Sequence, residues 1–175
     1  MGFVMNNITL AVDHGARSGY SIFTNGKYTH SGIVELGDVK SLRKAYKEFN
    51  NIFAIYKPTN VVIEKVNIAG AKFGGENIVK LAQLQAVVIL LAQQYGCFVQ
   101  EVNPMQLKKY ITGNGRAEKR EVAEVVADFC GLNPNHICVP VRFKRKDGIK
   151  TYLADESDAI ALGIYATKGL KAHLQ

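Results

Sequence analysis

Cysteine is scarce in this chain of 175 residues, with Cys97, Cys130 and Cys138 only. The odd number and the lack of a Cys-x-x-Cys pair indicate neither a disulfide framework nor a zinc ribbon. One alternative stays open, a zinc site built from Cys130, His136 and Cys138. A fourth ligand is missing nearby, and Cys130 ends an apolar helical stretch, so we expect no structural zinc.

The sequence also lacks a long apolar run, an internal repeat, a low-complexity segment and a domain linker. The longest apolar run, AVVILLA at residues 86–92, is far too short to cross a bilayer, and no signal peptide is recognisable. We therefore expect a single domain over residues 1–175, in a reducing cytoplasm and without a membrane partner.

Acidic residues are in the minority, since 15 Asp and Glu stand against 22 Lys and Arg and leave a net charge of +7. The hydrophobic share of 47% and the charged share of 21% are ordinary for a globular protein. A positive excess of this size favours a polyanionic partner, and nucleic acid rather than a membrane surface. A solvated basic surface would give the same excess.

Hydrophobic periodicity predicts an α/β fold. An apolar run that ends at Asp13 and a segment that alternates around Asn25-Gly26 predict three strands joined by tight turns. Further strands are expected at residues 60–66 and 97–102, and helices at 38–57, 77–95, 103–110, after the turn at 113–119, and 155–168. Residues 131–153 are expected to be irregular, with a basic hairpin-like segment at 142–150. This order predicts a five-stranded mixed sheet with helices on both faces.

Two carboxylates lie in stretches that otherwise suit burial. Asp13 ends the first strand and Glu64 lies in the fourth, and a buried carboxylate is costly unless it is paired or bound to a cation. Asp155 and Asp158 share one face of the last helix, where acidic residues also offset the helix dipole. If the four converge, divalent cations would resolve their repulsion, and oxygen ligands favour Mg²⁺ or Mn²⁺. Two such ions about 4 Å apart can activate water and stabilise the leaving oxygen of a phosphodiester.

Four segments together resemble the RuvC family of Holliday-junction resolvases, which have the ribonuclease H-like fold. They are AVDHGARSGY around Asp13, VVIEKV around Glu64, ADESDAIALGI near the end, and the lysine-bearing LKKYITGNGRAEKREVAEVV between them. The resemblance spans residues 8–166, and GNGRAEK and ADESDAIAL are its most specific parts. It implies a structure-selective DNA endonuclease that resolves four-way junctions and leaves 5′-phosphate and 3′-hydroxyl ends.

The resemblance also implies roles for single residues. The family's catalytic, metal-binding acids are matched by Asp13, Glu64, Asp155 and Asp158, which would hold two Mg²⁺ ions, with Mn²⁺ as a substitute. Lys119 matches a lysine near the scissile phosphate, and Lys108 matches a second basic contact to DNA. Arg116, in the same stretch, is expected to bind DNA as well. Phe73, with Lys72 beside it, matches an aromatic residue that stacks on a base at the junction. Packing of Phe73 back onto the following helix is the alternative.

The helix expected at residues 77–95 bears on the oligomeric state. It is apolar nearly all round at residues 86–92, so one face can pack on the sheet while another is left over. The resemblance implies that the second face forms a homodimer, in keeping with the two-fold symmetry of a four-way junction. A helix deep in a monomer core is the alternative.

Several features depart from the family pattern. His14 follows the first acid where the family has proline, and Arg17 is expected to contact a phosphate. The segment RFKRKDGIK looks like an insertion that forms either a flap on a DNA arm or a solvated loop. Its basic residues are Arg142, Lys144, Arg145, Lys146 and Lys150. These differences indicate a bacteriophage or otherwise divergent member, in the cytoplasm of a bacterium or an infected cell.

Three rival functions stay open. A nuclease of the same fold could cut forks, flaps or RNA–DNA hybrids, although the basic loops and the dimer-type helix favour branched DNA. An actin-like ATPase has a first strand similar to AVDHGARSGYSIF, but 175 residues are too few for its two lobes. A catalytically silent junction-binding module would gain affinity by losing the four acids, all of which are present.

Overall fold

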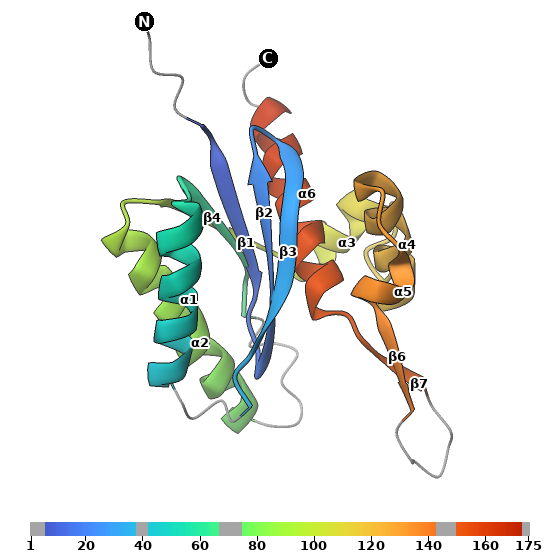
Figure 1. Cartoon of the computed structure of the whole chain (residues 1–175). Helices are drawn as coiled ribbons and strands as arrows, with labels where there is room; N and C mark the ends of the chain where they lie inside the picture. Colours follow the sequence, from blue (N-terminus) through green and yellow to red (C-terminus); the bar gives the residue numbers. More distant parts are fainter. Residues whose placement is uncertain (1–5, 38–41, 67–74, 143–149, 173–175) are drawn as a thin grey trace, which may run out of the picture.

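Figure 1 shows a computed structural model of the chain, which describes residues 6–37, 42–66, 75–142 and 150–172. The strands are β1 (Ile8–Asp13), β2 (Arg17–Thr24), β3 (Lys27–Glu35), β4 (Asn60–Glu64), β5 (Phe98–Val102), β6 (Val139–Arg142) and β7 (Lys150–Leu153). The helices are α1 (Leu42–Tyr56), α2 (Gly75–Gln94), α3 (Pro104–Thr112), α4 (Lys119–Cys130), α5 (Pro134–Ile137) and α6 (Asp155–Ala172).

Five strands form one mixed sheet in the order β3-β2-β1-β4-β5, as the sequence predicts. β1, β2 and β3 are antiparallel neighbours, and the turn from β2 to β3 places Asn25 and Gly26 at positive φ, 52° and 79°. β4 pairs parallel to β1, and β5 pairs parallel to β4, with α1 and α2 as the crossovers. The carboxyl ends of β1 and β4 therefore lie side by side at one edge of the sheet.

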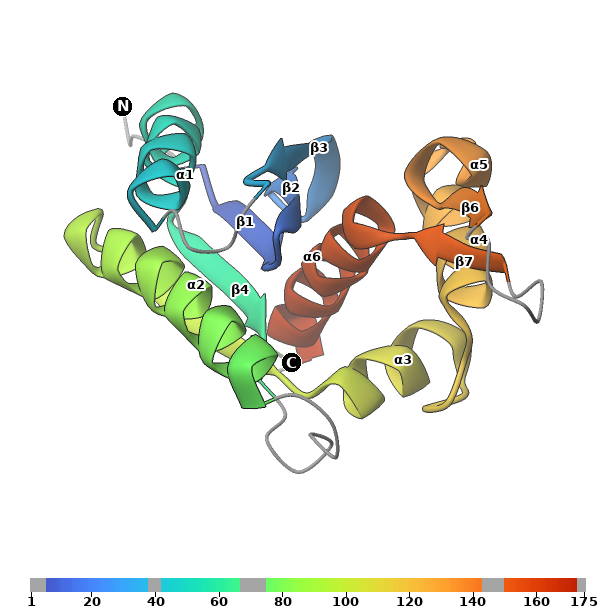
Figure 2. The ribbon, with the colours of Figure 1, turned by 90° about the horizontal axis from the view of Figure 1, so that it is seen from below.

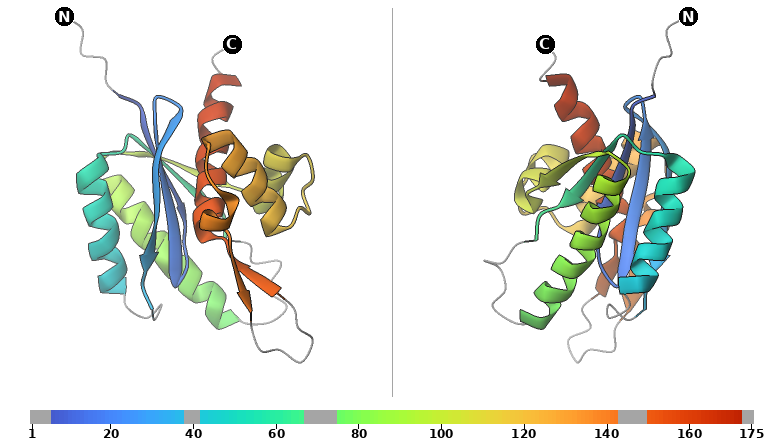
Figure 3. Two further views of the ribbon diagram at one scale, coloured as in Figure 1. Left: turned by 45° about the vertical axis from the view of Figure 1, so that its right-hand side comes forward. Right: turned by 90° about the vertical axis from the view of Figure 1, so that its left-hand side faces the viewer.

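Helices cover both faces of the sheet (Figures 2 and 3). α1 and α2 lie on one face of the sheet. There Phe49, Phe53, Leu84 and Leu91 pack against the side chains that β1 and β4 direct to this face, and together they form one core. α6 lies on the other face, with α3 and α4 packed beside it around a second core. None of the helices in the described ranges has both the length and the apolar content to span a membrane.

α6 packs tightly against β2, because small side chains line the contact. Ser21 Oγ donates to the Ala159 carbonyl oxygen at 2.8 Å across it. A Cβ on Gly19 would lie 1.8 Å from the Asp155 carbonyl oxygen, and one on Gly163 would lie 2.2 Å from a ring carbon of Phe23. The two elements can approach this closely only because both positions are glycine. The contact fixes where the first turn of α6 lies along the sheet.

The prediction of an irregular segment at residues 131–153 is wrong in part. Asn133 caps the short helix α5 by accepting from the Asn135 backbone N–H at 2.9 Å, and β6 and β7 form an antiparallel pair. This pair projects away from the five-stranded sheet in Figure 1. Elements of four residues carry too little periodicity to be predicted, and Pro140 within β6 argues locally against a strand.

Candidate active site

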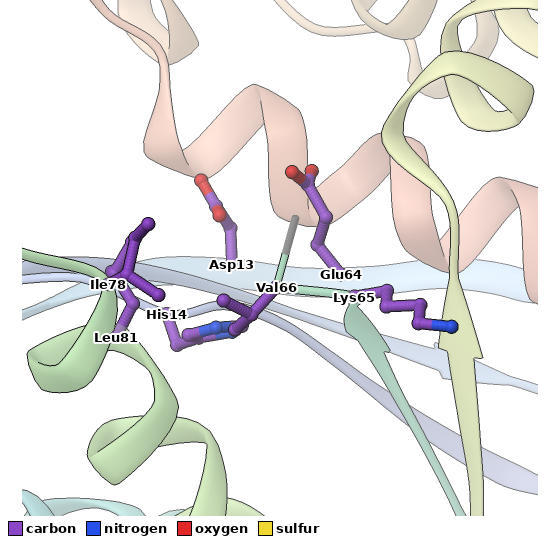
Figure 4. A pocket seen from close by; sticks show the side chains of 7 residues that line it. All are labelled: Asp13, His14, Glu64, Lys65, Val66, Ile78 and Leu81. Atoms are coloured by element: carbon purple, nitrogen blue, oxygen red, sulfur yellow. The ribbon is translucent and has the colours of Figure 1, made fainter. Parts of the chain in front are cut away.

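The structure brings the four predicted acids to one region of the fold. Asp13 ends β1 and Glu64 ends β4, and the parallel pairing of these strands sets the two carboxylates on adjacent strand ends. Figure 4 shows both side chains pointing toward α6, whose first turn carries Asp155 and Asp158. The charges of the other three acids all act on Asp13, so Asp13 lies within electrostatic reach of each of them.

The electrostatics of the group favour a positive partner. Burial raises the pKa of Asp13 well above its usual range, and the charges of Asp158, Glu64 and Asp155 raise it further. Burial also raises the pKa of Asp158, although Lys119 opposes this shift. A carboxylate in such surroundings is costly as an anion, and a nearby cation removes the cost.

Lys119, the first residue of α4, forms an ion pair with one of the acids, Asp158. Its Nζ lies 3.4 Å from Asp158 Oδ2. Burial works against the ammonium, but the charges of Asp158, Asp13 and Asp155 outweigh this effect and raise the pKa of Lys119. The side chain therefore stays positive beside the acids, where the resemblance predicts a lysine.

Glu64 changes its charge close to neutral pH. Burial and then the charge of Asp158 raise its pKa to about 7, while Lys108 and Lys119 oppose the shift. Lys108 lies on α3, and its Nζ donates to the Ala117 carbonyl oxygen at 2.9 Å, so the side chain is held against the loop before α4. Both predicted lysines thus lie within electrostatic reach of Glu64.

Arg17 also reaches the acids, and sequence reasoning missed this contact. At the start of β2, its Nη1 donates to Asp155 Oδ2 and its Nε donates to Glu35 Oε1 at 2.9 Å. The partners are 18 and 138 residues away along the chain, so no local pattern pointed to them. Glu156, the third acid of the helix start, turns to β3 instead and accepts from Ser31 Oγ at 2.6 Å.

The donor chemistry of the group suits a hard divalent cation, because all four acids offer carboxylate oxygens. Among the described residues, however, no three His, Cys, Asp or Glu side chains are already close enough together to hold an ion. Arg17 and Lys119 each bond one of the α6 carboxylates in this arrangement. The oxygen donors of the four acids therefore suit a metal ion, and the carboxylates would have to move closer together to bind it.

A cavity of about 260 Å³ opens beside the first two acids, lined by Asp13, His14, Glu64, Lys65, Val66, Ile78 and Leu81. His14 directly follows β1, and Figure 4 shows it on the opposite side from the Asp13 carboxylate, near the side chains of Ile78 and Leu81 on α2. Burial lowers the pKa of His14 to about 4, so the ring is neutral. In the described structure its Nδ1 has no hydrogen-bond partner. His14 therefore does not join the four acids.

Much of the predicted DNA-binding set lies outside the described residues. This applies to Lys72, Phe73, Lys144, Arg145 and Lys146, and Arg142 is described only as backbone at the end of β6. Arg116 is exposed in the loop before α4, where its backbone N–H donates to Asn114 Oδ1 at 3.0 Å.

The cysteines of the alternative zinc site lie in apolar surroundings. Cys138 is fully buried beside Ala123 and Ala154, and Cys130 packs at the edge of the core under α6. Burial raises the pKa of the Cys130 thiol to about 11, which disfavours the thiolate that binds zinc.

Comparison with known proteins gives a consistent family. The sequence model of crossover junction endodeoxyribonuclease RuvC matches residues 9–141. The RuvC of Neorickettsia sennetsu is 33% identical over 140 residues, which cover 74% of this chain and 82% of the relative. The RuvC of Helicobacter hepaticus is 32% identical over 174 residues, which cover 94% of this chain and 84% of the relative.

Solved structures share the fold. Thermus thermophilus RuvC in complex with a Holliday junction substrate matches with a TM-score of 0.68 at 19% identity, over 96% of both chains. The yeast mitochondrial Holliday junction resolvase Ydc2 matches with a TM-score of 0.62 at 12% identity, over 95% of this chain and 81% of that one. These likenesses confirm the predicted α/β, ribonuclease H-like class. The chain belongs to the RuvC family of crossover junction endodeoxyribonucleases.

Proposed function

We propose that the chain is a metal-dependent endonuclease that resolves four-way DNA junctions and leaves 5′-phosphate and 3′-hydroxyl ends. The observation that carries the proposal is the meeting of carboxylates from β1, β4 and α6 around Asp13, whose pKa they raise. Membership of the RuvC family and the excess of basic residues support DNA as the substrate. In this proposal, residues 1–175 form a single nuclease domain.

The four acids would hold two Mg²⁺ ions, for which Mn²⁺ would substitute. Such ions supply chemistry that the side chains lack, since they activate water and offset charge on the leaving oxygen. The raised pKa values of Asp13 and Glu64 support this role, because burial destabilises both carboxylate anions and a bound cation would offset that cost.

Lys119 and Lys108 supply positive charge that does not depend on an ion. Lys119 remains an ammonium beside Asp158, so it would stabilise negative charge that develops on the scissile phosphate. Lys108, on α3, would fix the DNA strand through a second phosphate contact.

Two further segments of the chain would add to the DNA surface. Phe73 follows Glu64 by nine residues along the chain, so a base stacked on its ring would lie near the cleavage site, with Lys72 and Arg116 at the neighbouring phosphates. β6 and β7, the strands at the two ends of the basic segment 142–150, project away from the five-stranded sheet (Figure 1), which fits a contact of this segment to another DNA arm.

A homodimer through α2 is the assembly that a two-fold junction requires. Val79, Gln83, Ala86 and Leu90 form an exposed stripe along α2, in which Val79 is 56% and Leu90 48% exposed. The opposite side of the helix packs into the core. An exposed, largely apolar stripe on a helix that already covers a sheet is typical of a contact surface.

Asp13→Asn tests the proposal. We expect cleavage of a labelled four-way junction in Mg²⁺ to fall by about a thousandfold or more. Junction binding in EDTA should be unchanged or tighter, because one negative charge that faces phosphate is gone. Asp128→Asn makes the same change at an exposed carboxylate of α4 and should cleave like the wild type. An Asp13→Asn protein that cuts at the normal rate would remove Asp13 from the active site.

A further inference from the structure

Arg17 is a cationic residue at the acid group for which the proposed function has no role. Its guanidinium bonds Glu35 at the end of β3 and Asp155 at the start of α6, so one side chain joins three elements. The side chain is 27% exposed, and that of Asp155 is 23% exposed. The Arg17–Asp155 pair is therefore partly shielded from water, where an ion pair is stronger than at an open surface.

β2 places Asp155 in two independent ways. Gly19 lies two residues after Arg17, on the same face of β2. A Cβ on Gly19 would lie 1.8 Å from the Asp155 carbonyl oxygen, so only glycine leaves room for the Asp155 backbone here. Arg17 then holds the Asp155 side chain from the same strand. Backbone and carboxylate are thus both fixed relative to β2, the neighbour of the strand that ends in Asp13.

We propose that Arg17 is a positioning residue that aims the Asp155 carboxylate at the metal ion. The guanidinium donates to Oδ2 of Asp155 through Nη1 and to Glu35 through Nε, so Oδ1 of Asp155 would remain available to bind an ion. Without Arg17, the repulsion from Asp13 and Asp158 would turn the Asp155 side chain away. This inference rests on the proposed function, because it assumes that the four acids bind an ion.

Two physical effects of Arg17 on metal binding oppose each other, so the sign of the measured effect decides between them. A positive charge beside the site repels a cation, and its removal alone would tighten metal binding. A partner that orients a metal-binding carboxylate does the reverse, and its loss usually weakens the metal affinity by about 10-fold to 100-fold. Positioning therefore predicts weaker binding in Arg17→Gln, and charge repulsion predicts tighter binding.

The test is calorimetric titration of Mn²⁺ into the metal-free protein without DNA. We expect Arg17→Gln to weaken binding by about 10-fold or more. Arg17→Lys should weaken it too, because an ammonium cannot present the planar fork that bonds two carboxylates. Glu35→Gln should have a smaller effect in the same direction and none when Arg17 is already replaced. Arg120→Gln removes an arginine that bonds Glu124 and Asn135 on α4 and α5, and it should bind like the wild type.

A junction-cleavage assay at increasing Mg²⁺ separates positioning from a general folding defect. In Arg17→Gln we expect the half-saturating Mg²⁺ concentration to rise by the same factor as in calorimetry, while the rate at saturation stays within about threefold of the wild type. A rate that falls equally at every Mg²⁺ concentration, or Mn²⁺ binding that is unchanged or tighter, would overturn the inference. Wild-type protein that binds no Mn²⁺ would instead overturn the metal site of the proposed function, which makes the two failures distinguishable.

Discussion

Glu64 lies at the end of β4 with a carboxyl pKa of about 7, raised from 4.5 chiefly by burial. The folded protein therefore holds this proton more tightly than the unfolded chain does. The resulting stabilisation is complete below about pH 4.5 and is lost as the pH rises through about 7. Without a metal ion, ionisation of Glu64 thus lowers the stability of the folded protein at neutral pH.

Glu64→Gln should remove this pH dependence, because glutamine keeps the shape of the side chain without the charge. In EDTA we expect the variant to match the wild type near pH 4.5 and to be more stable above about pH 7, by at most about 3 kcal/mol. Denaturant unfolding of both proteins over this range measures the difference. The titration of His14 cancels in it, because burial alone lowers the pKa of His14. Equal stabilities at about pH 8 would contradict the raised pKa of Glu64.

The acids could be predicted at the scale of the residue, and their partners could not. Asp13 and Glu64 are lone carboxylates in apolar strands, so the cost of burying them was visible in the sequence. Arg17 bonds partners that only the folded chain brings near. Glu156 lies between Asp155 and Asp158 in the sequence, but its position on α6 places it beside β3, where it accepts from Ser31 Oγ.

At the scale of the element, the packing of α6 on β2 decides where Asp155 and Asp158 lie. Gly163, in the interior of α6, faces Phe23 of β2, and an added Cβ would lie 2.2 Å from the ring. Helix propensity alone would make alanine at this position stabilising by about 0.5–1 kcal/mol. The clash with a fully buried ring should reverse that sign.

We expect Gly163→Ala to destabilise the protein by about 1–3 kcal/mol and to slow junction cleavage, since it moves α6 away from β2. Phe23→Leu should relieve part of the clash, so the double variant should be more stable than the sum of the single effects predicts. Chemical unfolding of the four proteins gives this coupling. If Gly163→Ala proved stabilising, close packing would not set the position of α6.

The five strands of the sheet and the helices of nine residues or more were predictable, whereas the four-residue elements α5, β6 and β7 were not. Each of the five sheet strands and the helices around them has enough apolar periodicity, or a strong enough turn or cap signal, to be located. The glycine contacts between β2 and α6 left no local signal, because a glycine in a helix looks the same whether it meets a ring or water. α5, β6 and β7 are stabilised by pairing and capping within residues 133–153 rather than by their own periodicity.

At the scale of the whole molecule, the exposed stripe of α2 predicts how two copies meet. Leu90→Glu places a charge in the proposed contact and should convert the proposed dimer to a monomer. Val125→Glu makes the same change at a residue of α4 that is 42% exposed, and it should stay dimeric. Light scattering after gel filtration distinguishes the two. A Leu90→Glu protein that remains dimeric would place the interface elsewhere.

The central claim, metal-dependent cutting of four-way junctions, is tested most directly by a cleavage assay on equimolar labelled four-way junction, three-way fork and linear duplex, in Mg²⁺ and in EDTA. We expect paired nicks at symmetric positions of the four-way junction, in Mg²⁺ only, with the fork and the duplex cut far more slowly. Equal cutting of fork and junction would contradict junction selectivity and indicate a broader branched-DNA nuclease. Tight junction binding without any cutting in Mg²⁺ or Mn²⁺ would contradict catalysis by the four acids.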